Sequence, residues 1–291
     1  MKRFTCTLIL ALGAMFIVAC NGAEKNTKTT YQLFDTIEVE GRQGVATDGN
    51  YLYVSGSTAL YKYTMDGQLV LKQEKPFEGL PLECNHIGDI DVWNGEIYAG
   101  CEYFMDGQGK NIQVVVYDTD SMKFKYSIPW NPQSGQVECC GLAVDRDRNE
   151  VWMADWVQGG ELYCYDLATR SYKRNLKLSP ALKLQQGIYC KNGKMLISCD
   201  DGDAEQKAAD HLYVCDLNTG KTKLFRTMND FILTGEIEGL TVNPKTQDLI
   251  VMSNRGARII LGMPKGFYEG YDHEIHNLYI YKKLTKSALD N

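Results

Sequence analysis

The sequence is short of the features that mark nucleic-acid-binding and membrane-spanning proteins. Its 31 Lys and Arg residues are outnumbered by 37 Asp and Glu residues, for a formal net charge of −6, and no basic cluster stands out. A chain of this kind is poorly suited to binding nucleic acid, because that binding depends on neutralising phosphates. The main apolar run, residues 8–18, is too short to span a bilayer stably. We therefore expect no nucleic-acid partner and no transmembrane helix.

Paired metal-binding cysteines and helical periodicity are also lacking. None of the 10 cysteines belongs to a CxxC pair, so their spacing gives no zinc motif. Several of them, such as Cys164, Cys190 and Cys215, lie within apolar strand-like runs, where a small buried hydrophobe is the favoured role. No disulfide pairing can be deduced from these positions. No helical run separates the strand-like segments, which excludes a two-domain α/β arrangement.

The first thirty residues have the composition of a targeting segment and a tether. Two basic residues precede the apolar run, which closes with Ile17-Val18-Ala19-Cys20 and resembles the lipobox of bacterial lipoproteins. The resemblance implies a signal peptide over 1–19, a lipidated Cys20 and a flexible tether over 20–30. It also implies a lipid-anchored place in the cell envelope, in the outer membrane given Asn21, and a formal charge of −8 after cleavage. A plain secretory signal with a chance cysteine is the alternative.

Internal repetition is the strongest signal in the chain. Five units share one order of short apolar runs rich in Val, Ile, Tyr and Leu, separated by turn-forming residues such as NGE, KNG and DLNTG. A glycine opens each unit, and the spacings between these glycines are 44, 53, 46 and 52 residues. Periods of this length with four strands per unit are typical of β-propellers. We predict a single all-β domain over 31–291, folded as a five-bladed β-propeller, and expect a monomer. The opening glycines are Gly44, Gly88, Gly141, Gly187 and Gly239.

The last unit lacks its outermost strand, because the chain stops soon after the apolar run at 278–283. Residues 31–39 form a strand-like segment that belongs to no unit. If the two pair, the N-terminal strand completes the last blade and closes the ring, which leaves fewer exposed sheet edges.

The longer connections all fall on one face of the predicted disc, where inner strands begin and second strands end. Long loops on one side of a rigid scaffold are where binding and catalysis concentrate. These connections span residues 74–86, 103–111, 129–138, 200–210, 228–237 and 254–277. Acidic, amide and histidine side chains stand at the same strand ends, so they are expected to ring the axis. Such a ring suits either a hard cation held by oxygen ligands or an acid–base pair around a small substrate. Crowded acidic groups of this kind need a cation, a proton or an arginine to offset their charge, and Arg255 could serve as the arginine.

The repeat motifs resemble those of a broad propeller group that contains SMP-30/lactonase-like, phytase/esterase-like and YncE-like proteins. The Glu-Gly-Leu-Thr-Val stretch at 238–242 and the Leu-Tyr-x-Tyr-Asp third strands carry the resemblance, which covers residues 31–283. In lactonase-like members, which have six blades, a Glu before Gly together with Asn and Asp from other blades binds a divalent cation, commonly calcium. The resemblance therefore implies a calcium site formed by Glu238, Asp155, Asp200 and Asn254.

These observations predict a ligand site on the axial face, in a metal-assisted hydrolase or lactonase that acts on a small molecule or carbohydrate. His86 or Glu102 is the expected base. The expected substrate-binding residues are Glu138, Gln186, Arg255 and Tyr268. A non-catalytic module is the alternative, in which the aromatic residues of the 254–277 loop grip a glycan or a protein. A purely structural envelope lipoprotein is the third reading. The same residues also have an explanation without a ligand, because loop ends are commonly polar and His86 can serve as a structural hydrogen-bonding residue.

Overall fold

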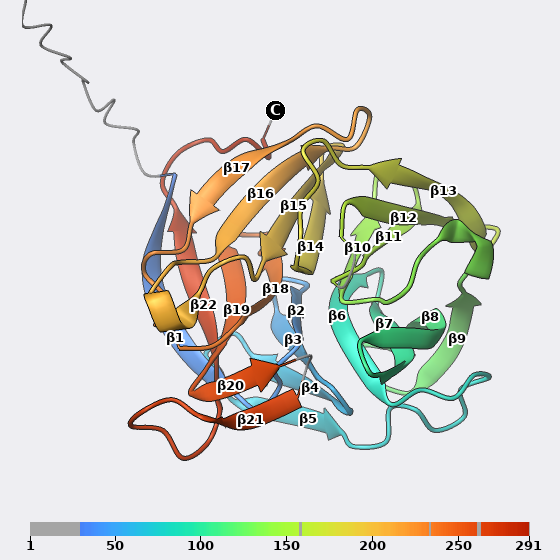
Figure 1. The fold of residues 1–291 in the computed structure, drawn as a ribbon. Coiled ribbons are helices and arrows are strands. Elements are labelled where there is room, and N and C mark those ends of the chain that lie inside the picture. Colours follow the sequence, from blue (N-terminus) through green and yellow to red (C-terminus); the bar gives the residue numbers. More distant parts are fainter. Residues whose placement is uncertain (1–29, 157–158, 233, 261–262, 291) are drawn as a thin grey trace, which may run out of the picture.

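The computed structural model describes residues 30–290, apart from 157–158, 233 and 261–262. Within this part of the chain, five four-stranded antiparallel sheets are arranged around a common axis (Figure 1). The predicted all-β, five-bladed propeller is therefore confirmed. Two single-turn 3₁₀ helices, η1 (Pro132–Ser134) and η2 (Ala204–Gln206), interrupt the loops. No helix in the described residues is both long and apolar enough to cross a membrane. The predicted signal peptide and lipidated Cys20 lie outside these residues.

Each of the first four blades is a simple meander, ordered from the axis outward. Blade 1 consists of β2 (Gly44–Thr47), β3 (Tyr51–Gly56), β4 (Ala59–Thr64) and β5 (Leu69–Gln73). Blade 2 consists of β6 (His86–Trp93), β7 (Glu96–Met105), β8 (Gln108–Asp118) and β9 (Phe124–Pro129). Blade 3 consists of β10 (Gly141–Asp145), β11 (Glu150–Ala154), β12 (Glu161–Asp166) and β13 (Ser171–Lys177). Blade 4 consists of β14 (Gln185–Lys191), β15 (Lys194–Cys199), β16 (His211–Asp216) and β17 (Thr222–Thr227).

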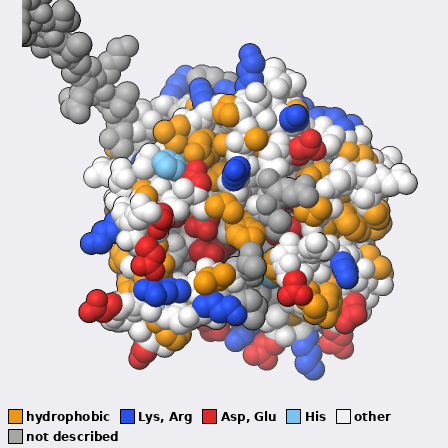
Figure 2. Space-filling model, in the orientation of Figure 1, with side chains coloured by type: hydrophobic (Ala, Val, Ile, Leu, Met, Phe, Trp, Pro, Cys, Tyr) orange, Lys and Arg blue, Asp and Glu red, His pale blue; other side chains and the backbone are white. Residues whose placement is uncertain are grey.

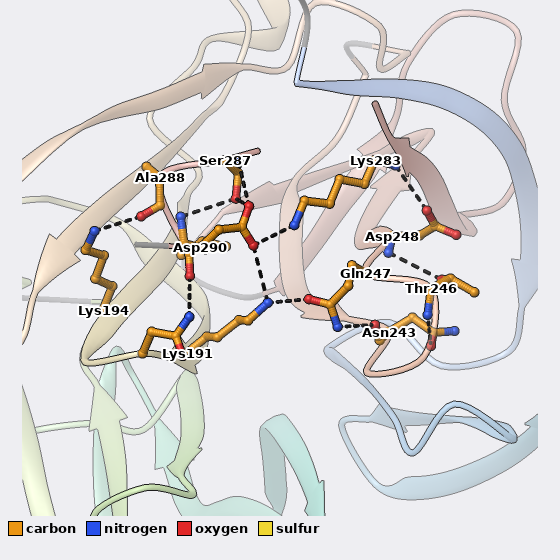
Figure 3. A network of polar contacts seen from close by, with 12 residues as sticks. Lys191, Lys194, Asn243, Thr246, Gln247, Asp248, Lys283, Ser287, Ala288 and Asp290 are labelled. Atoms are coloured by element: carbon orange, nitrogen blue, oxygen red, sulfur yellow. Dashed lines mark hydrogen bonds and ion pairs between the residues drawn. The ribbon is translucent and has the colours of Figure 1, made fainter. Parts of the chain in front are cut away.

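The fifth blade is closed by the beginning of the chain, as predicted. It contains β18 (Ile237–Val242), β19 (Leu249–Arg255), β22 (Ile275–Lys283) and, outermost, β1 (Tyr31–Val39). β1 pairs antiparallel with β22, with Ile37 opposite Leu278. The C-terminal tail reinforces this closure, since Asp290 accepts hydrogen bonds from Lys283 Nζ at 2.6 Å and from the Ser287 amide at 2.6 Å (Figure 3). The N-terminal strand β1 and the tail after β22 thereby both contribute to the last blade.

Strand order within a blade explains the burial pattern of each strand. Every residue of the inner strand β10 is buried between neighbouring blades, whereas the outermost strand β13 alternates between exposed and half-buried positions. An edge strand with one wet face shows this period of two. The β6–β7 turn is made by Asn94 and Gly95, with φ of 50° and 73°. Two positive φ angles define a type I′ turn, which fits the twist of a two-residue hairpin and explains the Asn-Gly pair.

The axis itself is closed by the glycines that open the units. A Cβ atom on Gly187 would lie 2.4 Å from Gly239 Cα, and one on Gly44 would lie 2.6 Å from Asp89 Cα. The buried Asp89 side chain fills the remaining space and accepts hydrogen bonds from the amides of Ile188 at 3.0 Å and Ile90 at 2.9 Å. The opening glycines are thus required by close packing, and they divide the centre of the disc into two separate mouths.

Two predicted loops contain strands. The 103–111 connection is a continuation of β7 and β8 around a tight turn at Asp106 and Gly107, which have φ of 53° and 75°. The 254–277 connection contains the hairpin of β20 (Ala257–Ile260) and β21 (Met263–Phe267), which lies at the front of Figure 1. The eight cysteines of the described residues are all buried and free. Their role as small core hydrophobes agrees with their positions within or beside buried strands.

Candidate functional site

The axial pocket opens on the face that carries the long loops, and its cavity measures about 90 Å³. Inner-strand entrances and second-strand ends from several blades form its wall, including Gln43, His86, Glu138, Gln186 and Glu238. Figure 2 shows acidic side chains near the centre of the face seen in Figure 1. Typical small-molecule pockets measure roughly 300–1,000 Å³. The axial pocket is therefore smaller than the cavities that usually enclose a whole drug-sized molecule.

His86 and Glu102 form a hydrogen-bonded pair beside this pocket. They face each other across β6 and β7, with His86 Nδ1 3.2 Å from Glu102 Oε1. The Glu102 side chain is fully buried, and its Oε2 accepts a hydrogen bond from the Cys139 amide at 3.1 Å. Burial raises the pKa of Glu102 to about 8, and the charge of Asp155 contributes to this rise. Burial, followed by the charge of Arg42, lowers the pKa of His86 to about 4.

Two further carboxyl groups lie at the entrance to blade 3. Glu138 is buried and accepts a hydrogen bond from the Trp156 amide at 2.6 Å. Asp155 is also buried and accepts one from the Tyr163 hydroxyl at 2.9 Å. Burial raises the pKa of Asp155 to about 7. Burial, followed by the charge of Glu102, holds the pKa of Glu138 well above its ordinary range.

Arg42 is the cation of the pocket, and three glutamates surround it. Its guanidinium lies 3.1 Å from Glu274, 3.4 Å from Glu236 and 3.9 Å from Glu238. Burial acts to lower the pKa of Arg42, but the charges of the three glutamates outweigh it and raise the pKa. Burial raises the pKa of Glu236 to about 7 and that of Glu238 well above its ordinary range. One cation cannot balance three carboxylates, so protons offset the rest of the charge.

Asn254 is fixed by three partners and is not free to bind a ligand. Its Nδ2 donates to Glu238 Oε1 at 2.7 Å and to the Arg42 carbonyl at 3.0 Å, while its Oδ1 lies 2.9 Å from His276 Nδ1. Burial lowers the pKa of His276, which therefore stays neutral at neutral pH. The neutral imidazole donates its Nδ1 hydrogen to Asn254, and the amide in turn orients Glu238.

The predicted site residues separate into three groups. Four of them line the axial pocket: His86, Glu138, Gln186 and Glu238. Glu102 and Asn254 form hydrogen bonds with residues of the pocket wall, and the charge of Asp155 acts on Glu138 in that wall. Asp200 and Tyr268 line an adjoining cavity of about 130 Å³, and Glu236 borders both cavities. Arg255 lines neither of them. Arg42, and not Arg255, is the cation that faces the axial acids.

The four predicted calcium ligands do not converge on one point. Glu238 is bound by an amide hydrogen of Asn254, whose oxygen is turned to His276. Asp155 is held by Tyr163, and Asp200 faces the adjoining cavity. Among the described residues, no group of three or more His, Cys, Asp or Glu side chains is arranged to hold a metal ion. This donor set does not fit a calcium ion shared by the four residues, so we derive no catalytic step through calcium, and calcium binding stays a prediction.

Several residues of the pocket were not predicted from the sequence. Arg42 stands two positions before the opening Gly44, as His86 does before Gly88. Glu274 and His276 lie where β22 begins, and only the long insertion before this strand hinted at them. Trp156 and Cys140 also line the pocket. The buried Trp156 Nε1 has no hydrogen-bond partner among the described residues.

Comparison with known proteins identifies the fold but no family. No family model matches the sequence, and no curated protein matches it significantly. A glutaminyl cyclase from Myxococcus xanthus is similar in structure, with a TM-score of 0.57 and 10% identity over 88% of this chain and 97% of that one. A protein of unknown function from Bacteroides thetaiotaomicron has a TM-score of 0.51 and 11% identity, over 86% and 72% of the two chains. A gluconolactonase from Xanthomonas campestris has a TM-score of 0.50 and 14% identity, over 82% and 72%. At these identities the likeness establishes a shared propeller fold.

Proposed function

We propose that the protein is a hydrolase of small acyl compounds, such as lactones and esters, that works by acid–base chemistry in the axial pocket. One observation carries the proposal. A neutral imidazole, His86, is hydrogen-bonded to a fully buried carboxyl group whose pKa is about 8, and both lie beside a concave pocket. Buried groups with pKa values moved toward neutrality are those that transfer protons effectively near pH 7.

Each proton of the reaction has a place in this arrangement. When Glu102 is ionised, its carboxylate accepts the Nδ1 hydrogen of His86, and Nε2 is then free to take a proton from an attacking water. Because the pKa of Glu102 is far above that of His86, the proton passes through the imidazole to Glu102. Glu138, which burial keeps protonated, supplies the proton for the leaving oxygen. The rate is therefore expected to rise with pH until it levels off near pH 8.

The indole of Trp156 supplies a donor for the carbonyl oxygen of the substrate. Its Nε1 is buried, has no partner among the described residues, and belongs to a side chain that lines the pocket. An unpaired buried donor costs about 1–3 kcal/mol, and a substrate acceptor would recover this free energy. Donors aimed at a carbonyl oxygen also stabilise the charge that develops on it during attack.

The test is a hydrolase screen of the full chain and its Glu102→Gln variant. Gluconolactone, aryl esters, glycosides and an N-terminal glutaminyl peptide cover the chemistry named for the similar structures and the carbohydrate alternative. Removing a general base typically costs about 10²–10⁴-fold, so kcat/KM of Glu102→Gln should fall at least a hundredfold. Glu78→Gln, on an exposed loop, is the matched control and should keep the wild-type rate. Equal rates in wild type and Glu102→Gln would refute the proposal.

We also propose that the propeller is a lipid-anchored envelope protein, because residues 17–20 resemble a lipobox. Stable attachment to a membrane needs two acyl chains, and a diacylated Cys20 would provide them. Labelling with radioactive palmitate followed by membrane fractionation tests this. The label and the membrane association should both disappear in Cys20→Ala. A palmitate-free wild-type protein found in the soluble fraction would contradict the anchor.

The competing function is a glycan- or protein-binding module, and the β20–β21 hairpin favours it. Ile260 is 58% exposed and Phe267 is 45% exposed, while the Arg258 guanidinium carbon lies 5.0 Å from the centre of the Tyr268 ring. Apolar side chains on a projecting hairpin are available to a partner. A glycan array with wild type and Tyr268→Ala separates the two functions. Array binding that Tyr268→Ala abolishes, in a protein that hydrolyses nothing, would establish the module.

A further inference from the structure

A second and larger cavity opens on the face opposite the axial pocket. It measures about 440 Å³, within the range of roughly 300–1,000 Å³ that is usual for small-molecule sites. All five blades contribute to it through the ends of their inner strands, for example Thr47, Trp93, Arg146, Tyr189 and Val242. It shares no lining residue with the axial pocket. The packed opening glycines and the Asp89 carboxyl group lie between the two mouths.

The two cationic groups of this second cavity, Arg146 and Lys191, are already paired. Arg146 donates to Asp91 Oδ1 at 2.7 Å and to the Val92 carbonyl at 2.9 Å. Lys191, which lines the cavity, lies 3.6 Å from Asp290 of the C-terminal tail and donates to Gln247 (Figure 3). A charged ligand would have to compete with these partners, and a neutral one would not. The cavity therefore favours an uncharged ligand.

Two of the three acidic side chains that line the same cavity are engaged as well. Asp145 pairs with Arg148 at 3.1 Å. Asp48 accepts hydrogen bonds from the amides of Asn50 and Tyr51 at 2.7 and 2.8 Å. Asp48 and Asp145 still have lone pairs for a ligand hydroxyl. Asp147 also lines the cavity and has no side-chain partner among the described residues, but it is exposed, so water and salt screen its attraction for a cation.

Aromatic and apolar groups complete the cavity. Tyr189 is only 8% exposed and lines it, and no hydrogen-bond partner of its hydroxyl is found among the described residues. Trp93 is half-buried, and Val242 and Pro244 add an apolar side. The Tyr189 hydroxyl is open to the cavity, where a ligand hydroxyl can take the place of water as its hydrogen-bond partner. An aromatic face beside hydroxyl and amide groups matches the alternating apolar and hydroxylated surfaces of a sugar ring.

We propose that this cavity is a second ligand site, which takes a neutral sugar residue. Trp93 supplies the stacking face, and the Tyr189 hydroxyl supplies a hydrogen bond. The site is independent of the proposed hydrolase, because the closed axis separates the two mouths and the cavities have no residue in common.

Saturation-transfer NMR with the full chain tests the site, with methyl β-glucoside, N-acetylglucosamine and its β-1,4-linked disaccharide as the probes. At least one probe should bind at millimolar concentration. Trp93→Ala should weaken it tenfold or more, and Tyr189→Phe, which removes only the hydroxyl, should weaken it about two- to tenfold. Failure of all three probes to bind the wild-type protein would overturn the proposal.

Matched variants keep the result specific to this cavity. Trp130 packs against the same hydrophobic cluster as Trp93 but does not line the cavity, so Trp130→Ala should bind the probe as wild type does. Tyr172→Phe, on the outermost strand of blade 3, is the control for Tyr189→Phe. Binding that survives both Trp93→Ala and Tyr189→Phe would place the sugar elsewhere and refute the site. Glu102→Gln should leave probe binding unchanged, whatever its effect on hydrolysis.

Discussion

Replacing Glu102 by Gln should stabilise the protein, and the gain should grow with pH. Gln reproduces the protonated acid, since its oxygen can accept from the Cys139 amide and its NH₂ can donate to His86 Nδ1. Burial raises the pKa of Glu102 from its ordinary 4.5 to about 8, so the folded state keeps a proton that the unfolded state has already lost. Unfolding then releases a proton throughout this interval, and stability falls as the pH rises.

The magnitude follows from the size of the shift. Below about pH 4.5 both states are protonated and the contribution of this group to stability is fully present. Between the two pKa values the free energy of unfolding of the wild type should fall relative to Glu102→Gln by about 1.4 kcal/mol per pH unit. The accumulated difference is about 5 kcal/mol at pH 8, equivalent to roughly 10 °C in Tm for a domain of this size. Above pH 8 the difference should stay constant.

Urea unfolding of both proteins at pH values of about 5, 6, 7 and 8 measures this difference directly. Glu78→Gln alters an exposed carboxyl group, so its unfolding free energy should run parallel to that of the wild type at every pH. If the free energies of unfolding of the wild type and Glu102→Gln change in parallel between pH 5 and 8, then Glu102 does not keep its proton in the folded state and the prediction is refuted.

The remaining predictions concern the axial pocket and the closure of the last blade. Arg42→Gln should destabilise the protein by about 3–5 kcal/mol at pH 8 and by less at pH 5, where Glu236, whose pKa burial raises to about 7, is protonated, as urea unfolding at both pH values would reveal. Gly109→Ala should lower both stability and activity, because its Cβ would lie 2.0 Å from Glu102 Oε2, and the stability loss should shrink in a Glu102→Ala background. Deleting residues 31–39 should expose the edge of β22 and cause aggregation, detectable by light scattering. Because the four predicted calcium ligands do not converge, calcium returned after EDTA should leave the Tm unchanged, whereas a gain of about 2.7 kcal/mol at a hundred times its Kd, lost in Glu238→Gln, would show that calcium binds there.

The sequence was sufficient to predict the blades, because each strand and turn is encoded locally. Asn-Gly turns and apolar runs mark each hairpin, and the opening glycines mark each inner strand. The pairing of 31–39 with 278–283 was also predictable, since a ring with one strand missing has one complementary segment left. The 103–111 connection was placed in a loop because its polar residues give no strand pattern. In the structure these residues simply continue the β7–β8 ladder beyond the body of the blade.

The candidate site was predictable by position but not by partner. The repeat places His86, Glu138, Gln186 and Glu238 at equivalent strand entrances, and all four line the pocket. Which side chain bonds to which depends on distances between blades that the period does not encode. The orientation of Asn254 is an example, because it is set by His276 on β22 and by the Arg42 carbonyl of another unit. Residues brought in by the long insertion before β22 have no equivalent in other units.

The sign of the Glu102→Gln effect also separates two accounts of how the pocket holds its acidic charge. If protons offset that charge, the ordinary carboxylate is disfavoured in the fold, and removing the ability to ionise stabilises the protein above pH 4.5. If a bound cation offset it instead, the carboxylates would be stabilised in their charged form and their pKa values would fall. The Gln variant would then be less stable than the wild type at neutral pH, and the deficit would disappear in EDTA. Equilibrium unfolding at one pH near 8, with and without EDTA, is enough to decide between them.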